Sequence, residues 1–448
     1  MNKSSVQLPH ITQFTRSDDY RRVIHNLIPG GAHTYSKGDD QFPIHAPAAI
    51  THGKGAYCWD PDGNKYLDTL MGLTAVSLGH AYEPVLERVR QELEKGVNFS
   101  RPSVIEREMA ERFLALVPQH DMIKYAKNGS VVTTAAVKLA RAYTGRTLIA
   151  RPAEHPFYSY DDWFIGSTAC DFGIPREIKD MTILYRQDSL EDLERMFLEY
   201  PGQIACVISE PEKWIPLEPD FYEKAIALAH AHGAVWIMDE MITGFKTDYP
   251  GSIKKFNANP DLATWGKGIA NGFSFCALTG KKEIMQLGGI NREGTPKLFL
   301  VSTTHGGETH AIAAGLATMD VFEREPVITH NHSIGDYYIA GMKRILQEKN
   351  LTPHFDLTGF NWSVGMIVKN AAGQPDFKLR TLVMQEMICR GILFQGILSP
   401  CFSHTFEDID WMLAAFEETC DIFIQALDKG VEHYLVGPEI KPVFRKFN

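Results

Sequence analysis

Residues 221–240 read FYEKAIALAHAHGAVWIMDE, a helical pattern joined directly to a strand pattern. The first part spaces its apolar residues as a helix does, and it stops at Gly233, a residue type that commonly follows a last helical turn. The second part, AVWIMDE, is a short continuous apolar run, which is typical of a strand buried on both faces. A helix that leads into such a strand predicts a parallel sheet covered by helices.

The sequence on the N-terminal side repeats this alternation. TLIAR (147–151) and QIACVISE (203–210) are further apolar runs of strand length. TAAVKLARAYTG (134–145) has helical spacing, and SLEDLERMFLEY (189–200) adds a Ser-x-x-Asp capping signature at its start. We therefore expect an α/β fold, with a large domain at residues 72–320.

The two ends of the chain have a different pattern. Residues 321–448 contain a long helical stretch, then short strand-like segments, then a helical stretch that starts near SHTFEDID (403–410). GAYCWDPDGNKYLD (55–68) alternates apolar and polar residues around Asp62-Gly63, which predicts a β-hairpin. We expect residues 321–448 to form a small α+β domain, which the N-terminal segment, residues 1–71, joins.

Composition narrows the classes of protein. The 448 residues carry a net charge of −10 with both signs mixed along the chain, so the concentrated basic face that nucleic acid requires is not expected. The seven cysteines are scattered and form no C-x-x-C pair, which favours reduced thiols and gives no zinc-ribbon pattern. No apolar run resembles a signal peptide or reaches the ~20 residues of a membrane span, so a soluble cytoplasmic protein is expected.

Four features carry recognisable chemistry. Asp239 ends the AVWIMDE strand, where a carboxylate can form a charge-assisted hydrogen bond to a protonated heterocyclic nitrogen. Lys267 lies between two glycines in TWGKGIANG (264–272), and a partly desolvated lysine can lose its proton and form an imine with an aldehyde. NGS (128–130) precedes a helix, whose N-terminus can bind a phosphate. HPFYSYDDWF (155–164) supplies aromatic rings that can cover another flat ring.

A phosphate, a ring nitrogen, an aldehyde and a ring face are the parts of one cofactor, pyridoxal 5′-phosphate (PLP). Taken singly, each feature is more typical of a helix cap, a solvated lysine or a packed aromatic residue. Their order and combination along one chain indicate a site for this cofactor.

Longer motifs carry a family resemblance. The sequence resembles the class III, fold-type-I PLP aminotransferases, and within them the glutamate-1-semialdehyde aminomutase-like branch, over nearly the whole chain. The segments that carry the resemblance are IPGGAHTYSKG (28–38), GKGAYCWDPDGNKYLD (53–68), LGHAYEPV (78–85), KLARAYTGR (138–146), MDEMITGFK (238–246), PDLATWGKGIANG (260–272) and HAIAAGLA (310–317).

The resemblance implies a fold and a set of roles. The large domain is expected to hold a mixed, mostly parallel sheet flanked by helices, and both termini are expected to build the small domain. Lys267 should form the Schiff base with the cofactor and shuttle the substrate proton, while Asp239 should pair with the pyridinium nitrogen. Gly129 and Ser130 match the phosphate-binding residues, and Phe157 stands where the family usually has a ring-stacking tyrosine.

Two further positions concern the rest of the site. Glu210 matches the glutamate at the end of an active-site strand. Thr304, in STTHGG (302–307), matches a threonine that reaches the phosphate from the partner subunit. The resemblance therefore implies a homodimer with a shared active site.

The expected activity is transamination from an amino acid to an aldehyde or ketone. By family habit the donor is L-glutamate. A polar, partly basic pocket suits a small hydroxylated acidic acceptor, and an 8-oxo octulosonate-type sugar acid of lipopolysaccharide biosynthesis is one candidate. The residues expected to line this pocket are His33, Thr34, Lys37, Trp214 and His404.

Departures from the family pattern leave alternatives open. Val131 replaces the usual glutamate of the phosphate loop, Lys37 replaces an arginine of aminomutase-like members, and Leu73 replaces a tryptophan. These changes argue against the aminomutase substrate, although FIGSTACDFGIP (164–175) could serve as the gating loop of a glutamate-1-semialdehyde 2,1-aminomutase. A non-catalytic PLP-fold protein with a binding or regulatory role is the alternative of another class.

Histidine pairs raise the question of a metal. The two pairs considered are His305 with His310 and His230 with His232, and neither has a recognised metal-ligand spacing with a third ligand nearby. No metal site is expected.

Overall fold

The computed structural model describes residues 8–187, 189–212 and 214–448, which divide into two compact units. The large unit comprises Ala75–Ser77, Glu83–Ile328 and Phe444–Asn448. The small unit comprises the described residues up to Thr74, together with Leu78–Tyr82 and Thr329–Val443. The expected domain limits differ from this division in three places: residues 72–74 and 78–82 belong to the small unit, whereas residues 321–328 and 444–448 belong to the large unit.

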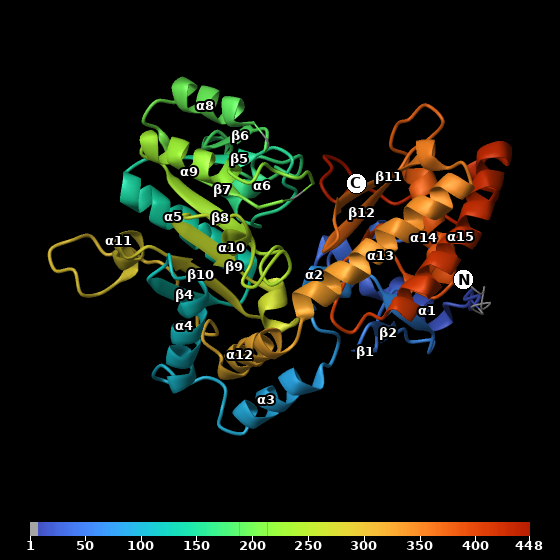
Figure 1. Cartoon of the computed structure of the whole chain (residues 1–448), viewed down its shortest axis with the longest axis horizontal. Helices are drawn as coiled ribbons and strands as arrows, with labels where there is room; N and C mark the ends of the chain where they lie inside the picture. The colour runs from blue at the N-terminus through green and yellow to red at the C-terminus, as the bar shows by residue number, and fades with distance from the viewer. Residues whose placement is uncertain (1–7, 188, 213) are drawn as a thin grey trace. The chain divides into compact units, whose positions relative to one another are not determined.

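The large unit is built on a seven-stranded sheet with the strand order β4-β10-β9-β8-β7-β5-β6 (Figure 1). The pairs β9–β8, β8–β7, β7–β5 and β5–β6 are parallel, while β10 runs antiparallel to both of its neighbours. The predicted mixed, mostly parallel sheet is thus confirmed. The strands are β4 (Met122–Ala126), β5 (Leu148–Pro152), β6 (Thr182–Tyr185), β7 (Ile204–Ser209), β8 (Val235–Glu240), β9 (Leu262–Trp265) and β10 (Cys276–Gly280).

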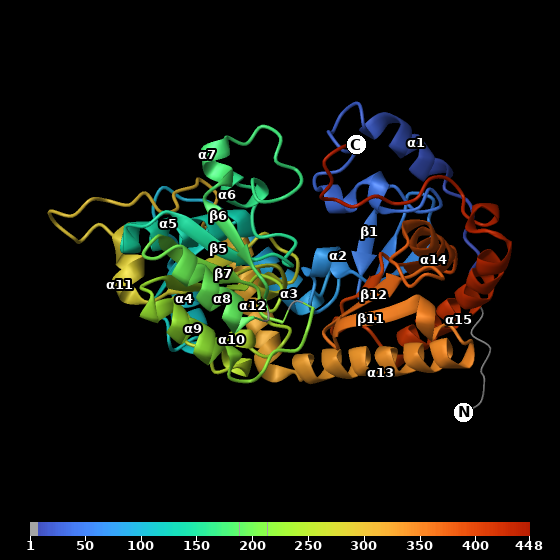
Figure 2. The ribbon, with the colours of Figure 1, turned by 90° about the horizontal axis from the view of Figure 1, so that it is seen from above.

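Helices cover both faces of this sheet. Crossovers between parallel strands are right-handed, so connections that run across the sheet in opposite directions place their helices on opposite faces. The path from β4 to β5 carries α5 (Gly129–Thr144), and the return path through β7, β8 and β9 carries α8 (Leu190–Glu199), α9 (Phe221–Ala231) and α10 (Ser252–Lys255). Figure 2 shows α5 on one side of the strands and α8, α9 and α10 on the other.

Local signals explain where these helices begin and end. The side chain of Ser189 accepts a hydrogen bond from the N–H of Asp192, the contact that the Ser-x-x-Asp signature predicts. Gly145 ends α5 with φ 69°, and Gly233 follows α9 with φ 70°, both in the left-handed region that glycine adopts without strain. The other helices of the large unit are α3 (Glu83–Leu93), α4 (Val104–Leu116), α6 (Asp162–Ile165), α7 (Arg176–Lys179), α11 (Lys282–Met285) and α12 (Thr309–Arg324).

The small unit contains two small sheets, ordered β1-β2-β3-β13 and β11-β12-β14. The predicted hairpin is confirmed, because Trp59 and Lys65 are antiparallel partners across the turn at Asp62-Gly63. The strands are β1 (His52–Lys54), β2 (Tyr57–Trp59), β3 (Lys65–Asp68), β11 (Phe355–Phe360), β12 (Ser363–Val368), β13 (Ile392–Leu393) and β14 (Ile397–Leu398).

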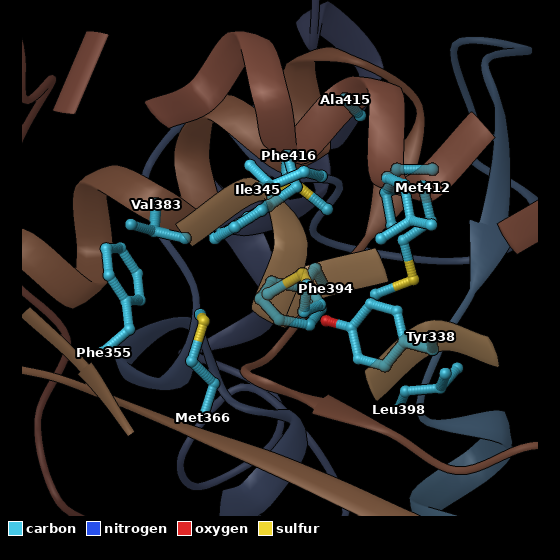
Figure 3. Close-up of a cluster of buried hydrophobic side chains, with 14 of the residues drawn as sticks. Tyr338, Ile345, Phe355, Met366, Val383, Phe394, Leu398, Met412, Ala415 and Phe416 are labelled. Carbon is cyan, nitrogen blue, oxygen red and sulfur yellow. The ribbon is translucent and has the colours of Figure 1, made fainter. Parts of the chain in front are cut away.

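Long helices pack on these sheets. α15 (Phe406–Lys429) begins with a capping box between Thr405 and Asp408, as the sequence near SHTFEDID predicts. Figure 3 shows the core of this unit, in which Tyr338 and Ile345 of α13 meet Met412 and Phe416 of α15. The remaining helices are α1 (Thr15–Ile24), α2 (Met71–Thr74), α13 (Val327–Glu348), which begins in the large unit, and α14 (Phe377–Cys389).

Candidate active site

The expected cofactor residues of the large unit gather at one edge of its sheet. Because β10 is antiparallel to both β4 and β9, β4 points in the same direction as the parallel strands. The carboxyl ends of β4, β5, β7, β8 and β9 therefore share one edge, which is where ligands bind in open α/β sheets. The residues that lie at or follow these strand ends are Gly129, Ser130, Phe157, Glu210, Asp239 and Lys267.

Asp239 is a buried carboxylate, and one of its two oxygens is hydrogen-bonded to other protein groups. It is 2 % exposed. Its Oδ1 accepts a hydrogen bond of 2.8 Å from the hydroxyl of Thr264 and one of 3.0 Å from the backbone N–H of Met241. Within the described part of the chain, Oδ2 accepts no hydrogen bond. One carboxylate oxygen thus remains for a ligand.

The surroundings of Asp239 disfavour the ionised form of its carboxyl group. Burial, and then the nearby charge of Glu210, raise the pKa of Asp239 to about 7, although Thr264 and Lys267 act in the opposite direction. A cationic N–H donor at Oδ2 would stabilise the ionised carboxylate. A protonated ring nitrogen has this property.

Lys267 lies near enough to Asp239 for its charge to lower the pKa of that carboxyl group. It begins a short 3₁₀ turn, Lys267–Ala270, directly after β9. Its φ of 48° is in the left-handed region, which costs a residue with a side chain of the order of 1 kcal/mol. The hydroxyl of Ser77 donates a 2.8 Å hydrogen bond to the carbonyl of Gly268 and helps to hold this turn. The lysine is therefore held in a specific, strained backbone geometry beside a buried carboxylate.

Met241 packs against the glycines of two different loops. A Cβ atom on Gly129 would lie 2.9 Å from Cε of Met241. A Cβ atom on Gly266, the residue before Lys267, would collide with Sδ of Met241 and lie 2.7 Å from Sγ of Cys276. Because residues 129 and 266 are glycines, the start of α5 and the loop that carries Lys267 can both approach Met241.

The N-terminus of α5 carries Gly129 and Ser130, the residues expected to bind a phosphate. The side chain of Asn128 accepts a 3.1 Å hydrogen bond from the N–H of Val131 and caps the helix. The hydroxyl of Ser130 accepts a 3.0 Å hydrogen bond from the N–H of Tyr160, which ties this turn to the aromatic loop. The first N–H groups of a helix and its positive dipole end suit a phosphate.

In the aromatic-rich segment 155–164, the ring of Phe157 is exposed and the ring of Tyr158 is buried. Phe157 is 48 % exposed and packs edge-on against Phe164, with ring centroids 5.7 Å apart. Tyr158 is buried, and its hydroxyl contacts His155 and accepts a 3.0 Å hydrogen bond from the N–H of Glu210. Phe157 is thus available to cover a flat ligand, whereas Tyr158 holds the residue at the end of β7.

Thr304 is exposed. Its carbonyl accepts a 3.0 Å hydrogen bond from the side chain of Asn98. Its side chain is thus presented to solvent in a single chain, and its expected role toward a partner subunit stays a prediction.

The expected substrate residues fall in both units. His33, Thr34 and Lys37 belong to the small unit, and Lys37 lies in a short 3₁₀ turn, Tyr35–Lys37. Trp214 belongs to the large unit, where its indole N–H donates a 3.0 Å hydrogen bond to the carbonyl of Glu154.

His404 does not fit the role expected of it. It is 0 % exposed, and Nδ1 accepts a 3.0 Å hydrogen bond from the N–H of Cys401. Its Nε2 lies 3.2 Å from the carbonyl of Asp68, to which it can donate. A side chain with no exposed surface and both ring nitrogens engaged by backbone cannot contact a substrate, so His404 is a structural residue of the small unit.

The arrangement in the large unit fits PLP. Asp239 offers an unused carboxylate oxygen for the ring nitrogen, and Lys267 offers an amine near that carboxylate. The capped N-terminus of α5 offers backbone N–H groups for the phosphate. The half-exposed ring of Phe157 offers a surface for the cofactor ring.

Sequence reasoning missed two residues that position this site, namely Thr264 and Met241. Thr264 lies opposite Asp239 in the parallel register of β9 and β8. No local pattern shows this contact. A threonine near the end of a strand that precedes the lysine loop is the only sequence signal for it.

Two further features of the described residues concern a metal site and a membrane span. Among residues 8–187, 189–212 and 214–448, no group of three or more His, Cys, Asp or Glu side chains could hold a metal ion. Within the same residues no helix has both the length and the apolarity that crossing a membrane requires.

Comparison with known proteins identifies the family. The model of the family described as "Aminotransferase class-III" matches residues 35–181 and 173–370. A glutamate-1-semialdehyde 2,1-aminomutase of Thermus thermophilus is 29 % identical, over 93 % of this chain and 99 % of its own length. A 3-aminobutyryl-CoA aminotransferase of Cloacimonas acidaminovorans is 28 % identical, over 88 % of this chain and 94 % of its own.

A solved structure agrees on the fold. The FumI protein of Sphingopyxis sp. MTA144, in a form that carries PLP, superposes with a TM-score of 0.84 at 23 % identity, over 93 % of this chain and 98 % of that one. This likeness confirms the fold-type-I architecture. Because the family model covers more than half of the chain, the protein belongs to the class-III aminotransferases, which are enzymes that depend on pyridoxal 5′-phosphate.

Proposed function

We propose that this protein transfers an amino group from an amino acid donor, L-glutamate, to an aldehyde or ketone on a small hydroxylated acidic acceptor. The observation that carries the catalytic part is the unused Oδ2 of the buried Asp239 beside Lys267. The donor is proposed from the habit of the family.

The residues of this chain have distinct roles. When bound, PLP supplies an aldehyde that takes up amino groups and a ring that accepts electrons. Lys267 would take the proton from the α-carbon of the amino donor and pass it to the bound cofactor, and in the second half of the reaction it would move a proton in the reverse direction, to the former carbonyl carbon of the acceptor. Asp239 holds a proton on the ring nitrogen, and Gly129 and Ser130 bind the phosphate through backbone N–H groups. Phe157 covers the ring and excludes water from one face.

The acceptor is inferred from the polar segment 33–37. His33 and Lys37 are exposed, and Thr34 is half-buried. An ammonium and an imidazole favour an acceptor with a carboxylate, and a lysine accommodates varied geometries because it lacks the rigid fork of an arginine. An octulosonate-type sugar acid meets these conditions, and we propose it as an acceptor to be tested. Neither curated relative reported above is named for such a compound.

The aminomutase is the second candidate, because one curated relative carries that name. Its expected gating loop, residues 164–175, is tied to the C-terminus of the chain. The thiol of Cys170 donates a 3.4 Å hydrogen bond to the carbonyl of Arg445, and Phe164 packs edge-on against Phe444, with centroids 6.3 Å apart. A segment held at two points is less suited to opening and closing in each turnover, which favours the transaminase.

An absorbance titration of the purified, PLP-loaded protein tests the proposal. L-Glutamate should remove the visible band and release 2-oxoglutarate in a one-to-one ratio with active sites. An added acceptor should then restore the band, and a panel of aldehydo and keto sugar acids, semialdehydes and acyl-CoA ketones would rank the acceptors.

Each outcome has a separate meaning. Turnover of glutamate 1-semialdehyde without any external acceptor would identify an aminomutase instead. A visible band that no amino acid alters would identify the non-catalytic alternative. A colourless protein that does not bind added PLP would overturn the proposal as a whole.

We further propose that the enzyme is a homodimer in which Thr304 contacts the phosphate of the partner's site. Mixing a Lys267→Ala chain with a Thr304→Ala chain tests this. Mixed dimers contain one site with neither change, so they should regain up to about a quarter to a half of wild-type activity when both single variants are inactive. Activity that never exceeds that of the two parents would exclude sharing.

A further inference from the structure

Lys127 and Glu308 form an ion pair that joins two segments of the cofactor site. Nζ of Lys127 lies 2.7 Å from Oε2 of Glu308, and the side chains are only 20 % and 18 % exposed. Lys127 directly precedes Asn128, the N-cap of α5 and thus of the phosphate-binding turn. Glu308 precedes α12 and ends the segment 302–308, which carries Thr304.

Glu308 uses its two oxygens for different segments. Oε2 faces Lys127, and Oε1 lies 2.9 Å from Nδ1 of His305, the residue after Thr304. Burial would raise the pKa of Glu308, but the hydrogen bond and the charge of Lys127 outweigh it and lower that pKa below its usual value. Glu308 is therefore ionised at neutral pH and links the two segments by charge-assisted hydrogen bonds.

Each segment also has its own anchor. The carbonyl of Lys127 accepts a 2.5 Å hydrogen bond from the hydroxyl of Ser274, which follows the lysine loop. The N–H of Thr309 donates a 3.1 Å hydrogen bond to the carbonyl of Val97, next to the residue that holds Thr304. The ion pair thus connects two segments that are otherwise held at different places in the large unit.

We propose that Lys127 and Glu308 are positioning residues that align the phosphate-binding turn of one active site with the Thr304 segment that serves the partner's site. The proposal rests on the function and the dimer proposed above. Lys127 also neutralises Glu308, whose unpaired carboxylate would repel the dianionic phosphate. Removing Lys127 alone is therefore worse than removing both charges.

The test measures the Kd of the cofactor-free protein for PLP by absorbance titration. Lys127→Met should raise Kd by about tenfold or more, and the isosteric Glu308→Gln by about threefold to tenfold. The double variant should bind more tightly than Lys127→Met, because no unpaired charge remains, but less tightly than the wild type, because the link between the two segments is lost. The swapped pair, Lys127→Glu with Glu308→Lys, should bind more tightly than Lys127→Met.

A matched control separates this role from general stability. Lys224 and Asp220 form an exposed ion pair of 2.6 Å at the start of α9, and neither is among the residues expected to contact the cofactor, so Asp220→Asn should leave the Kd for PLP unchanged. The Tm of each cofactor-free variant shows whether it folds, and Glu308→Gln keeps the volume of the side chain if Lys127→Met does not fold.

Two results would overturn the inference. One is wild-type affinity for PLP in both single variants. The other is a double variant that binds no better than Lys127→Met. If the wild-type protein itself does not bind PLP, the proposed function fails instead, so the two failures are distinguishable.

Discussion

The hydroxyl of Thr264 donates a 2.8 Å hydrogen bond to Oδ1 of Asp239, its direct partner in the register of β9 and β8. The bond occupies one carboxylate oxygen and fixes the orientation of the other. Because both atoms belong to central strands of the sheet, the geometry is set before any ligand binds. Preorganisation of this kind reduces the cost of binding.

Thr264→Val should therefore weaken cofactor binding. The substitution keeps the shape of the side chain but removes the donor, so the pKa of Asp239 rises further and its charged form is disfavoured. A lost hydrogen bond to a charged group is worth roughly 1.5–3 kcal/mol, which corresponds to an increase in the Kd for PLP of the order of tenfold to a hundredfold. Unchanged affinity would mean that Oδ1 does not need this donor.

Lys267→Ala should abolish turnover. Removal of a general acid–base group typically lowers the rate by 10²- to 10⁴-fold, and loss of the amine also removes covalent attachment of the cofactor. The visible band of the lysine-bound cofactor and its fixation by borohydride should both disappear. Lys282→Ala, at an exposed lysine of the same unit, is the control that should retain both properties.

Asp239 should contribute a share of the stability of the cofactor-free protein that falls as pH rises. The pKa of Asp239 is raised from 3.8 to about 7 in the folded chain, chiefly by burial. The folded protein therefore retains a proton that the unfolded chain releases, and this contribution is full at acidic pH and is lost as pH rises through about 7. Glu240, whose pKa burial also raises to about 7, contributes in the same direction.

Single substitutions distinguish the contribution of Asp239 to the pH dependence of stability from that of Glu240. Asp239→Asn should reduce the fall in Tm between about pH 5 and pH 8 and should also lower turnover by at least about a hundredfold. Glu240→Gln should reduce the same fall, but its main effect should be on stability, because Glu240 accepts hydrogen bonds from Thr243 and the N–H of Ile253. Equal pH profiles for the wild type and Asp239→Asn would refute the raised pKa.

Gly266→Ala should disturb the lysine loop. The new Cβ atom would collide with Met241 and approach Cys276, and overpacking of this kind costs roughly 1–3 kcal/mol. Part of this loss should be recovered by Met241→Ala in the same chain, which is measured as ΔΔG in a double-mutant cycle. Additive effects would show that Met241 is not the obstacle.

Much of the architecture could be predicted because its signals are local. These signals act between residues that are close in sequence. They are the apolar runs, the capping side chain of Ser189 and the glycines that end α5 and α9. Asp239 and Lys267 could be singled out for the same reason, since each stands at a strand end or between glycines. Such signals need no knowledge of which strand lies beside which.

The remaining features depend on contacts between distant parts of the sequence. The register of β8 and β9 brings Thr264 to Asp239, and the hydroxyl of Tyr158 meets the end of β7 only because β5 and β7 are neighbours. His404 looked like a ligand-binding residue, but packing in the small unit buries it completely. Local sequence determined the elements and the reactive groups. Strand order, register and burial are set by the packing of the whole chain, and only the tertiary structure decided which polar groups are engaged by the protein and which are left for a ligand.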